Sequence, residues 1–293
     1  MIELHRLTHP EHPFFLNPDK IISIEANPAG FCTEKVDALR EHGVNRVSLG
    51  VQSFSKPLLE TLERDHDAQQ IERTVEELRG RIDNFGFDLI FGVPGQSLED
   101  WHESLGRAVG LGPQHVSTYG LTYEKGTSFW TRREQRQLRP VDESVEAEMY
   151  STAMSWLPEH GFPQYELSNY ARAGYESRHN AVYWQGLPYF GFGPGAAAYV
   201  NGTRPTNHRS VTNWLKRVLG GESGIGVSET LSPASRCTSM GGAAVVTGRA
   251  VVSERAMYEP GTQRLALMYW NAPPTRRSGP RQYRAGGRRL KVC

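Results

Sequence analysis

The stretch FGFDLIFGVPG, residues 85–95, decides the fold of this chain. Its apolar run has the length of a buried strand, and the Gly and Pro residues at its end stop it before helical spacing begins at residues 98–111. One acidic residue, Asp88, interrupts the run, and an unpaired carboxylate is costly inside a protein. We therefore predict a buried strand in which Asp88 is either paired with a neighbour or faces a ligand site.

Similar strand patterns lie on both sides of this stretch and alternate with helical ones. The strands are predicted to start near residues 21, 46, 85 and 115, which spaces them by about 25 to 39 residues. That spacing suits right-handed parallel crossovers. The strands look continuously apolar, which predicts a sheet covered on both faces. Four units are too few for a closed eight-stranded barrel, so we expect an open sheet or a barrel whose earlier strands precede this chain.

The character of the sequence changes after Gly126. A long amphipathic helix is predicted over residues 143–160, a strand within residues 163–171 and a short helix over residues 213–219. The glycine-rich GFGPG, residues 191–195, lacks the spacing of a nucleotide-binding motif and predicts a tight backbone turn. The fold class is therefore α/β, with a smaller α+β part towards the carboxyl terminus.

Charge is distributed unevenly along the 293 residues. Residues 232–293 hold eleven Arg and Lys against two Glu, a net charge of +9, whereas the rest of the chain has a net charge of −8. A basic segment can bind phosphates. This one has no helical periodicity and no recognisable nucleic-acid module, so we do not expect a nucleic-acid partner. Its composition predicts a disordered tail.

The sequence also restricts compartment and metal chemistry. It has no run of about 20 apolar residues and no apolar signal segment at its start, so we expect a cytoplasmic protein with no membrane span. Its three cysteines, Cys32, Cys237 and Cys293, are too far apart for a disulfide framework or a spaced metal motif. We predict no metal ligand from these residues.

Polar residues at the ends of the predicted strands are the candidates for a binding site, because ligand sites of parallel βα folds lie there. Glu25 ends the first strand, where its carboxylate either accepts hydrogen bonds from an amine or a ribose or caps a turn. Gln52 ends the second strand, and its amide binds either a ligand or buried backbone groups. Arg64 on the next helix is either a surface residue or a partner for a carboxylate or phosphate. Tyr119 and Thr122 end the fourth strand.

Six motifs in this order resemble one known family. They are IEANP, GVNRVSLGVQSF, FDLIFGVPGQSLEDW, HVSTYGLTYEKGT, YELSNYA and SRHNAVYW, within residues 21 to about 217. Together they are similar to the oxygen-independent coproporphyrinogen III oxidase-like family of radical S-adenosylmethionine (SAM) proteins. EANP, VQSF and the last two motifs look more like the HemW branch of heme chaperones than the oxidases.

The resemblance implies a partial radical SAM (β/α)6 barrel over residues 1–131, a family-specific α+β region over residues 132–231 and a basic tail over residues 232–293. It implies SAM and a [4Fe-4S] cluster as cofactors, with no catalytic side chain assigned. The positions that match SAM contacts of the family are Glu25, Gln52, Arg64, Asp88 and, more weakly, Thr122.

For function, the resemblance implies a heme chaperone whose partners are heme or porphyrin and an unidentified heme-acceptor protein. Two alternatives stay open. One is an oxidase of porphyrin biosynthesis, and the other is a cluster-free protein that binds heme or a nucleotide.

The sequence departs from the family pattern in three places. The family's CxxxCxxC and GGGTP segments are absent, so we expect a chain that lacks the first strands of the barrel and is defective in cluster binding. Ala197 stands where the family often has a histidine. The match stops after LSPASR, and we expect that the residues after about Arg236 are not a native domain.

Overall fold

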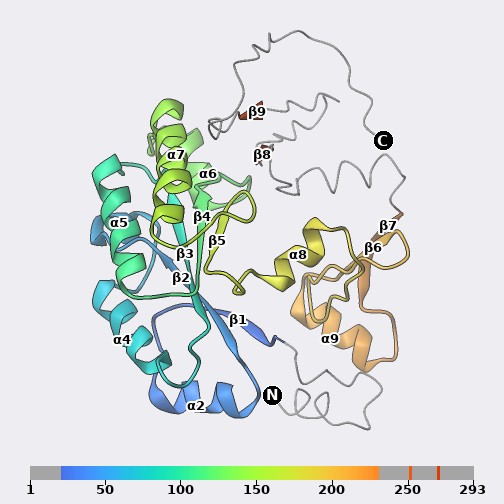
Figure 1. Cartoon of the computed structure of the whole chain (residues 1–293). Coiled ribbons are helices and arrows are strands. Elements are labelled where there is room, and N and C mark those ends of the chain that lie inside the picture. Colours follow the sequence, from blue (N-terminus) through green and yellow to red (C-terminus); the bar gives the residue numbers. More distant parts are fainter. Residues whose placement is uncertain (1–20, 231–250, 253–268, 271–293) are drawn as a thin grey trace, which may run out of the picture. The chain divides into compact units, whose positions relative to one another are not determined.

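The computed structural model describes residues 21–230 together with the short strands at residues 251–252 and 269–270 (Figure 1). The chain divides into two compact units, Met1–Glu176 and Ser177–Cys293. The first unit extends past the boundary predicted at residue 131, because the helix and strand that follow pack on its sheet. Among the described residues, no helix is both long enough and apolar enough to span a bilayer.

Five strands form the sheet of the first unit. In spatial order they are β1 (Ser23–Ala26), β2 (Arg46–Gln52), β3 (Phe85–Phe91), β4 (His115–Gly120) and β5 (Asn169–Ala171). The first four are parallel, whereas β5 runs antiparallel to β4. This confirms the predicted α/β class with a parallel sheet, and β1 is an open edge among the described strands.

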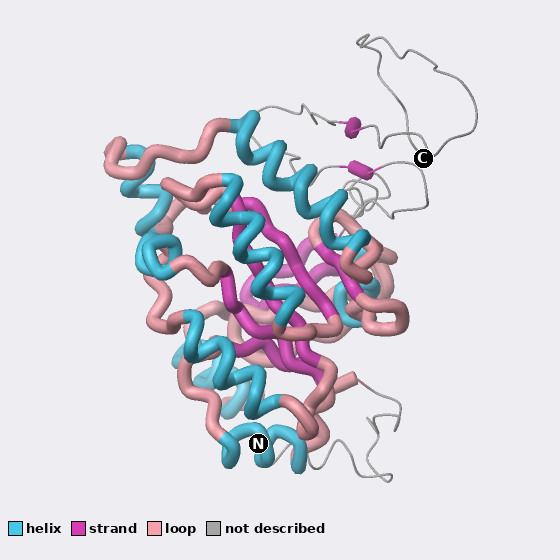
Figure 2. Tube along the Cα trace, turned by 60° about the vertical axis from the view of Figure 1, so that its left-hand side comes forward, coloured by secondary structure: helices cyan, strands magenta, loops and turns pink. Residues whose placement is uncertain are grey.

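Helices connect the strands. They are α2 (Thr33–Glu41), α3 (Lys56–Thr61), α4 (Ala68–Leu78), α5 (Leu98–Gly110), α6 (Ser128–Glu134) and α7 (Glu143–Glu159). Of these, α2, α4, α5 and α7 cover one face of the sheet (Figure 2), whereas α3 and α6 contribute to a separate small apolar cluster with Ile90 and Val93. Asp67 caps α4, and its side chain accepts a hydrogen bond from the Gln70 amide while the Gln70 side chain bonds back. The sequence did not predict α6, because a helix of seven residues with a charged end shows no clear periodicity.

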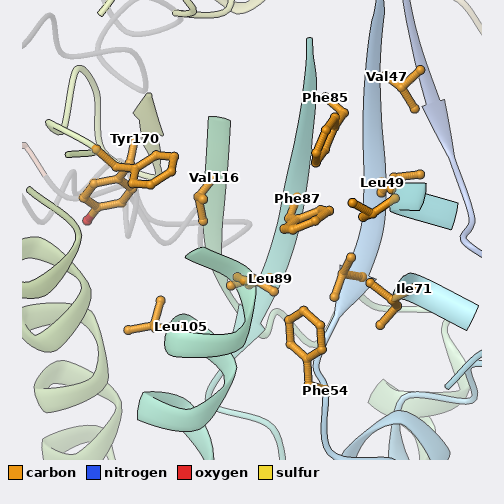
Figure 3. Packing of buried hydrophobic residues seen from close by; sticks show 14 of the residues in the cluster. Val47, Leu49, Phe54, Ile71, Phe85, Phe87, Leu89, Leu105, Val116 and Tyr170 are labelled. Atoms are coloured by element: carbon orange, nitrogen blue, oxygen red, sulfur yellow. The ribbon is translucent and has the colours of Figure 1, made fainter. Parts of the chain in front are cut away.

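The core lies between the sheet and these helices. Side chains from β2 and β3 meet α4 and α5 there (Figure 3), and the buried residues include Val47, Leu49, Ile71, Phe85, Phe87, Leu89 and Leu105. The buried Trp101 also ties α5 to α7, because its Nε1 donates a hydrogen bond to the Met149 carbonyl oxygen at 2.8 Å. Only alternate residues of β2 and β3 belong to this core. Arg46 and Ser48 on the other face of β2 are buried as well, which agrees with a sheet covered on both faces, although β2 is not continuously apolar.

The second unit contains a small hairpin and two helices. Its elements are α8 (Arg178–Trp184), β6 (Thr203–Asn207), α9 (Val211–Leu219), β7 (Ile225–Thr230), β8 (Val251–Val252) and β9 (Tyr269–Trp270). A Cβ atom at Gly191 would collide with the Ala197 backbone, and Gly193 and Gly195 have positive φ, which confirms the turn predicted for GFGPG. Apart from β8 and β9, the predicted tail lies outside the described residues.

Candidate functional site

The face of the sheet opposite the core is polar. Strand register places Ser23 beside Arg46, Glu25 beside Ser48, and Asp88 beside Ser117. Neighbours in register point to the same side of a sheet, and residues two apart on one strand do so as well. We call this surface the polar face and define it by Ser23, Glu25, Arg46, Ser48, Gly50, Gly86, Asp88, His115 and Ser117.

Asp88 lies in the middle of the polar face. The Ser48 hydroxyl, from β2, approaches its two carboxylate oxygens at 3.2 Å and 3.1 Å, and Ser117, from β4, also hydrogen-bonds its side chain. Burial raises the pKa of Asp88 above its ordinary 3.8, while the two serine hydrogen bonds act in the opposite direction. Of the two alternatives predicted for this carboxyl group, the structure shows pairing with neighbours, and these neighbours are hydroxyl groups.

Glu25 places a second carboxylate on the same face. It is exposed on the edge strand β1, and its negative charge contributes to the raised pKa of Asp88. Arg46 acts in the opposite direction and favours the ionised form of Asp88. The structure therefore brings Glu25 and Asp88 into one electrostatic environment, in which a cationic ligand group would be stabilised.

Gln52 ends β2 in an unusual backbone conformation. Its φ of +64° is left-handed, and the β2–β3 register shifts between Leu49 and Gln52. A Cβ atom at Gly50 would lie 2.8 Å from Gln52 Nε2 and 3.8 Å from the Ala26 carbonyl oxygen. The carboxamide of Gln52 thus folds back over Gly50, next to the end of β1, and glycine at position 50 makes room for it.

The remaining two predicted residues lie at the carboxyl-terminal edge of the strands. Arg64 is exposed in the loop after α3, and this loop is tied to the end of β1 because Asn27 Nδ2 donates a hydrogen bond to Asp65 Oδ1 at 3.2 Å. Thr122 is exposed in the segment after β4, and its hydroxyl lies 3.4 Å from the Gly120 carbonyl oxygen. Neither side chain makes a hydrogen bond to Glu25, Gln52 or Asp88 in the described structure.

Two further polar groups lie towards the amino-terminal ends of the strands, and the sequence did not identify them. Arg46 is only 7% exposed, and its Nη1 donates a hydrogen bond to Ser23 Oγ at 3.1 Å, whereas its Nε has no partner among the described residues. His115 contacts the Tyr165 hydroxyl through Nε2 at 2.6 Å. Burial, aided by the Arg46 charge, lowers the pKa of His115 to about 3, so its imidazole is neutral at pH 7.

These groups fit a polar nucleoside better than they fit an iron–sulfur cluster. Carboxylates, an amide and an incompletely paired guanidinium on one face provide acceptors and donors for amine, hydroxyl and carboxylate groups. A cluster needs converging thiolates. Within the described ranges, Cys32 is exposed and no group of three or more His, Cys, Asp or Glu side chains could hold a metal ion. The described residues therefore do not form a cluster site.

The fold and a family model define the class of protein. The model of the radical SAM superfamily matches residues 1–108. A structure described as coproporphyrinogen III oxidase (HemN) from Escherichia coli, a radical SAM enzyme, aligns with a TM-score of 0.65 at 20% identity, covering 77% of this chain and 55% of that one. This is a radical SAM fold, as the sequence motifs predicted.

Curated relatives narrow the class further. The chain is 41% identical over 194 residues to the heme chaperone HemW of Bacillus subtilis, which covers 66% of this chain and 51% of the relative. It is 38% identical over 208 residues to the HemW of Synechocystis, which covers 69% of this chain and 50% of the relative. It is also 39% identical over 186 residues to the mitochondrial radical S-adenosyl methionine domain-containing protein 1 of Mus musculus. This match covers 62% of this chain and 41% of the relative.

The chain belongs to the HemN-like family of radical SAM proteins and is close to HemW within it. This confirms the family predicted from the six motifs. The chain spans about half the length of the bacterial relatives that it matches. Membership in the radical SAM family implies SAM and a [4Fe-4S] cluster as the family's cofactors.

Proposed function

We propose that this chain is the SAM-binding portion of a HemW-like heme chaperone that acts in the cytoplasm. The observation that carries the proposal is its 37–41% identity to heme chaperones from several bacteria, over about two thirds of this chain. Heme or porphyrin is the proposed cargo, and an acceptor protein is the proposed recipient. The proposal covers SAM and heme binding, and no step passes through a cluster.

Each predicted site residue has a proposed part in SAM binding. Glu25 and Asp88 accept hydrogen bonds from the amino group or the ribose hydroxyls, and the Gln52 amide orients the ligand at the end of β2. Arg64 pairs with the SAM carboxylate, since a guanidinium matches a carboxylate in shape and charge. Thr122 adds a hydroxyl at the end of β4. The polar face supports these roles because Glu25 and Asp88 both lie on it and the Gln52 carboxamide folds back over Gly50 of the same face.

SAM binding is tested by calorimetric titration of the purified chain. We expect saturable binding for the wild type and a loss of at least about tenfold in affinity for Asp88→Asn, because a hydrogen bond to a charged group is worth about 1.5–3 kcal/mol. Asp37→Asn is the matched control, since Asp37 lies on α2 and pairs with Arg81 at the surface. Absence of SAM binding by the wild type, or equal losses in the two variants, would contradict the proposed site.

Heme binding is tested by following the Soret absorbance band of heme during titration with the same protein. A saturable spectral shift supports the chaperone, and its absence overturns it. Incubation with coproporphyrinogen III separates the chaperone from the alternative oxidase. Decarboxylation of the propionate side chains would favour the oxidase.

A further inference from the structure

Two serines from neighbouring strands hold the Asp88 carboxyl group. Ser48, on β2, is 7% exposed and approaches both carboxylate oxygens, while Ser117, on β4, is 2% exposed and hydrogen-bonds the same group. Asp88 itself lies between them on β3. The contact between Ser48 and Asp88 joins residues 40 positions apart, so it depends on strand register and not on a local turn.

This arrangement differs from an ordinary buried ion pair. Among the described residues, Asp88 forms no salt bridge, and its direct polar contacts are with serine hydroxyls. A hydroxyl that donates to a carboxylate favours the ionised form, yet it adds no charge to the site. The two serines can therefore keep Asp88 ionisable without neutralising the attraction that it exerts on a cationic ligand.

The charged and titratable groups around Asp88 come from three neighbouring strands. Glu25 on β1 opposes its ionisation and Arg46 on β2 favours it. His115 on β4 is neutral above pH 3, so it contributes no charge in the physiological range. With Asp88 and Glu25 both ionised, the net charge of Asp88, Glu25, Arg46 and His115 together is −1.

We propose that Ser48 and Ser117 are positioning residues of the ligand site, which hold the Asp88 carboxylate towards a positively charged group of the ligand and so couple binding to loss of the Asp88 proton. This inference rests on the proposed function, in which that ligand is SAM, whose sulfonium and amino groups are cationic. The bond that breaks is the O–H bond of the Asp88 carboxyl group, and its proton passes to solvent.

The coupling has a defined direction. Because the ionised form of Asp88 binds the cation, SAM affinity rises as the pH rises through the titration of Asp88 and is constant above it. Removal of one serine hydroxyl removes a group that favours ionisation, so the titration of Asp88 moves to higher pH. The expected shift is roughly one pH unit for each serine.

The experiment uses the full chain with Ser48→Ala, Ser117→Ala and the hydroxyl-retaining Ser48→Thr. Ser104→Ala is the matched control, because Ser104 is also buried, at 2% exposed, but lies on α5 away from the polar face. The first readout is carbon NMR of aspartate side-chain carboxyl groups in the ligand-free protein, with the Asp88 signal assigned through Asp88→Asn. The second is SAM affinity measured calorimetrically across a range of pH.

We expect the Asp88 titration to move upward in Ser48→Ala and Ser117→Ala and to stay in place in Ser48→Thr and Ser104→Ala. SAM affinity should fall about fivefold in the two alanine variants at the wild-type Asp88 midpoint, because a shift of one pH unit lowers the ionised fraction by about that factor, and should recover to within about twofold well above it. A structural role alone would lower affinity equally at every pH.

Each other outcome is decisive. Unchanged Asp88 titration in both alanine variants overturns the inference, and so does wild-type SAM affinity that is independent of pH across the Asp88 midpoint. In the second case the proposed function stands, because SAM still binds. If the wild type binds no SAM at any pH, the proposed function and the coupling both fail, while the NMR titration decides separately whether the serines hold Asp88.

Discussion

Replacement of Gly86 by alanine tests how closely β3 and β4 pack on the polar face. A Cβ atom at Gly86 would lie 3.0 Å from His115 Cβ, 3.0 Å from the His115 carbonyl oxygen and 3.4 Å from its Nδ1. These atoms belong to the backbone and to a side chain that is only 1% exposed, so they cannot move without displacing β4. Overpacking of this kind costs about 1–3 kcal/mol, and we expect Gly86→Ala to lower the free energy of unfolding by that amount.

Gly106→Ala is the matched control, with the opposite expected sign. Gly106 lies inside α5, and a Cβ atom there meets nothing within 4 Å. Alanine is favoured over glycine by about 1 kcal/mol in a helix interior, so the two variants should differ by roughly 2–4 kcal/mol.

Guanidinium denaturation followed by far-ultraviolet circular dichroism measures both free energies of unfolding. The dependence of the free energy on denaturant concentration should be the same in the wild type and both variants, so that their midpoints can be compared. A midpoint for Gly86→Ala at or above that of the wild type would refute the close packing of β3 against β4.

Three further predictions concern the polar groups of the sheet. Burial raises the pKa of Asp88, so the protein loses stability as the pH rises from 3.8 through the higher folded-state pKa, and Asp88→Asn should abolish this loss in denaturation measured against pH. The pKa of His115 is lowered from 6.5 to about 3, so the free energy of unfolding falls by up to roughly 5 kcal/mol as the pH falls through that interval. In His115→Gln the free energy of unfolding should depend less on pH over this range. Gln52→Gly should raise the free energy of unfolding by about 1 kcal/mol, because glycine adopts the left-handed backbone conformation without strain, and a lower value would contradict this. The same variant should bind SAM several-fold more weakly in calorimetry.

Most secondary structure of the first unit could be predicted from local signals. The apolar run at residues 85–91 is stopped by Gly92 and Pro94, and the helix that follows begins at a capping box formed by Ser97 and Asp100. The break between α3 and α4 was predictable for the same reason, since Asp67 supplies a cap. These features depend on residues close together in the sequence, which is where pattern analysis is informative.

The composition of the polar face could be predicted only in part, because it depends on register. Ser48 meets Asp88 across two strands, and the sequence singled out Asp88 but not its partner. The alternation in RVSLGVQ, residues 46–52, was the available signal, since it places Arg46 and Ser48 on one face of β2 and Val47 on the other. The left-handed conformation of Gln52 follows from the irregular pairing of β2 with β3, which no local pattern records.

The apolar core fixes the geometry of the polar face. A shift of β2 by one residue would turn Arg46 and Ser48 into the core and expose Val47 and Leu49, so burial of the two apolar side chains enforces the register. The groups held in place this way are themselves costly, because Asp88 and His115 both have pKa values displaced against their charged forms by burial. The apolar side chains on the other face of the same strands provide the stability that offsets this unfavourable burial. Ionisable groups can therefore gather on the one face where a ligand can interact with them.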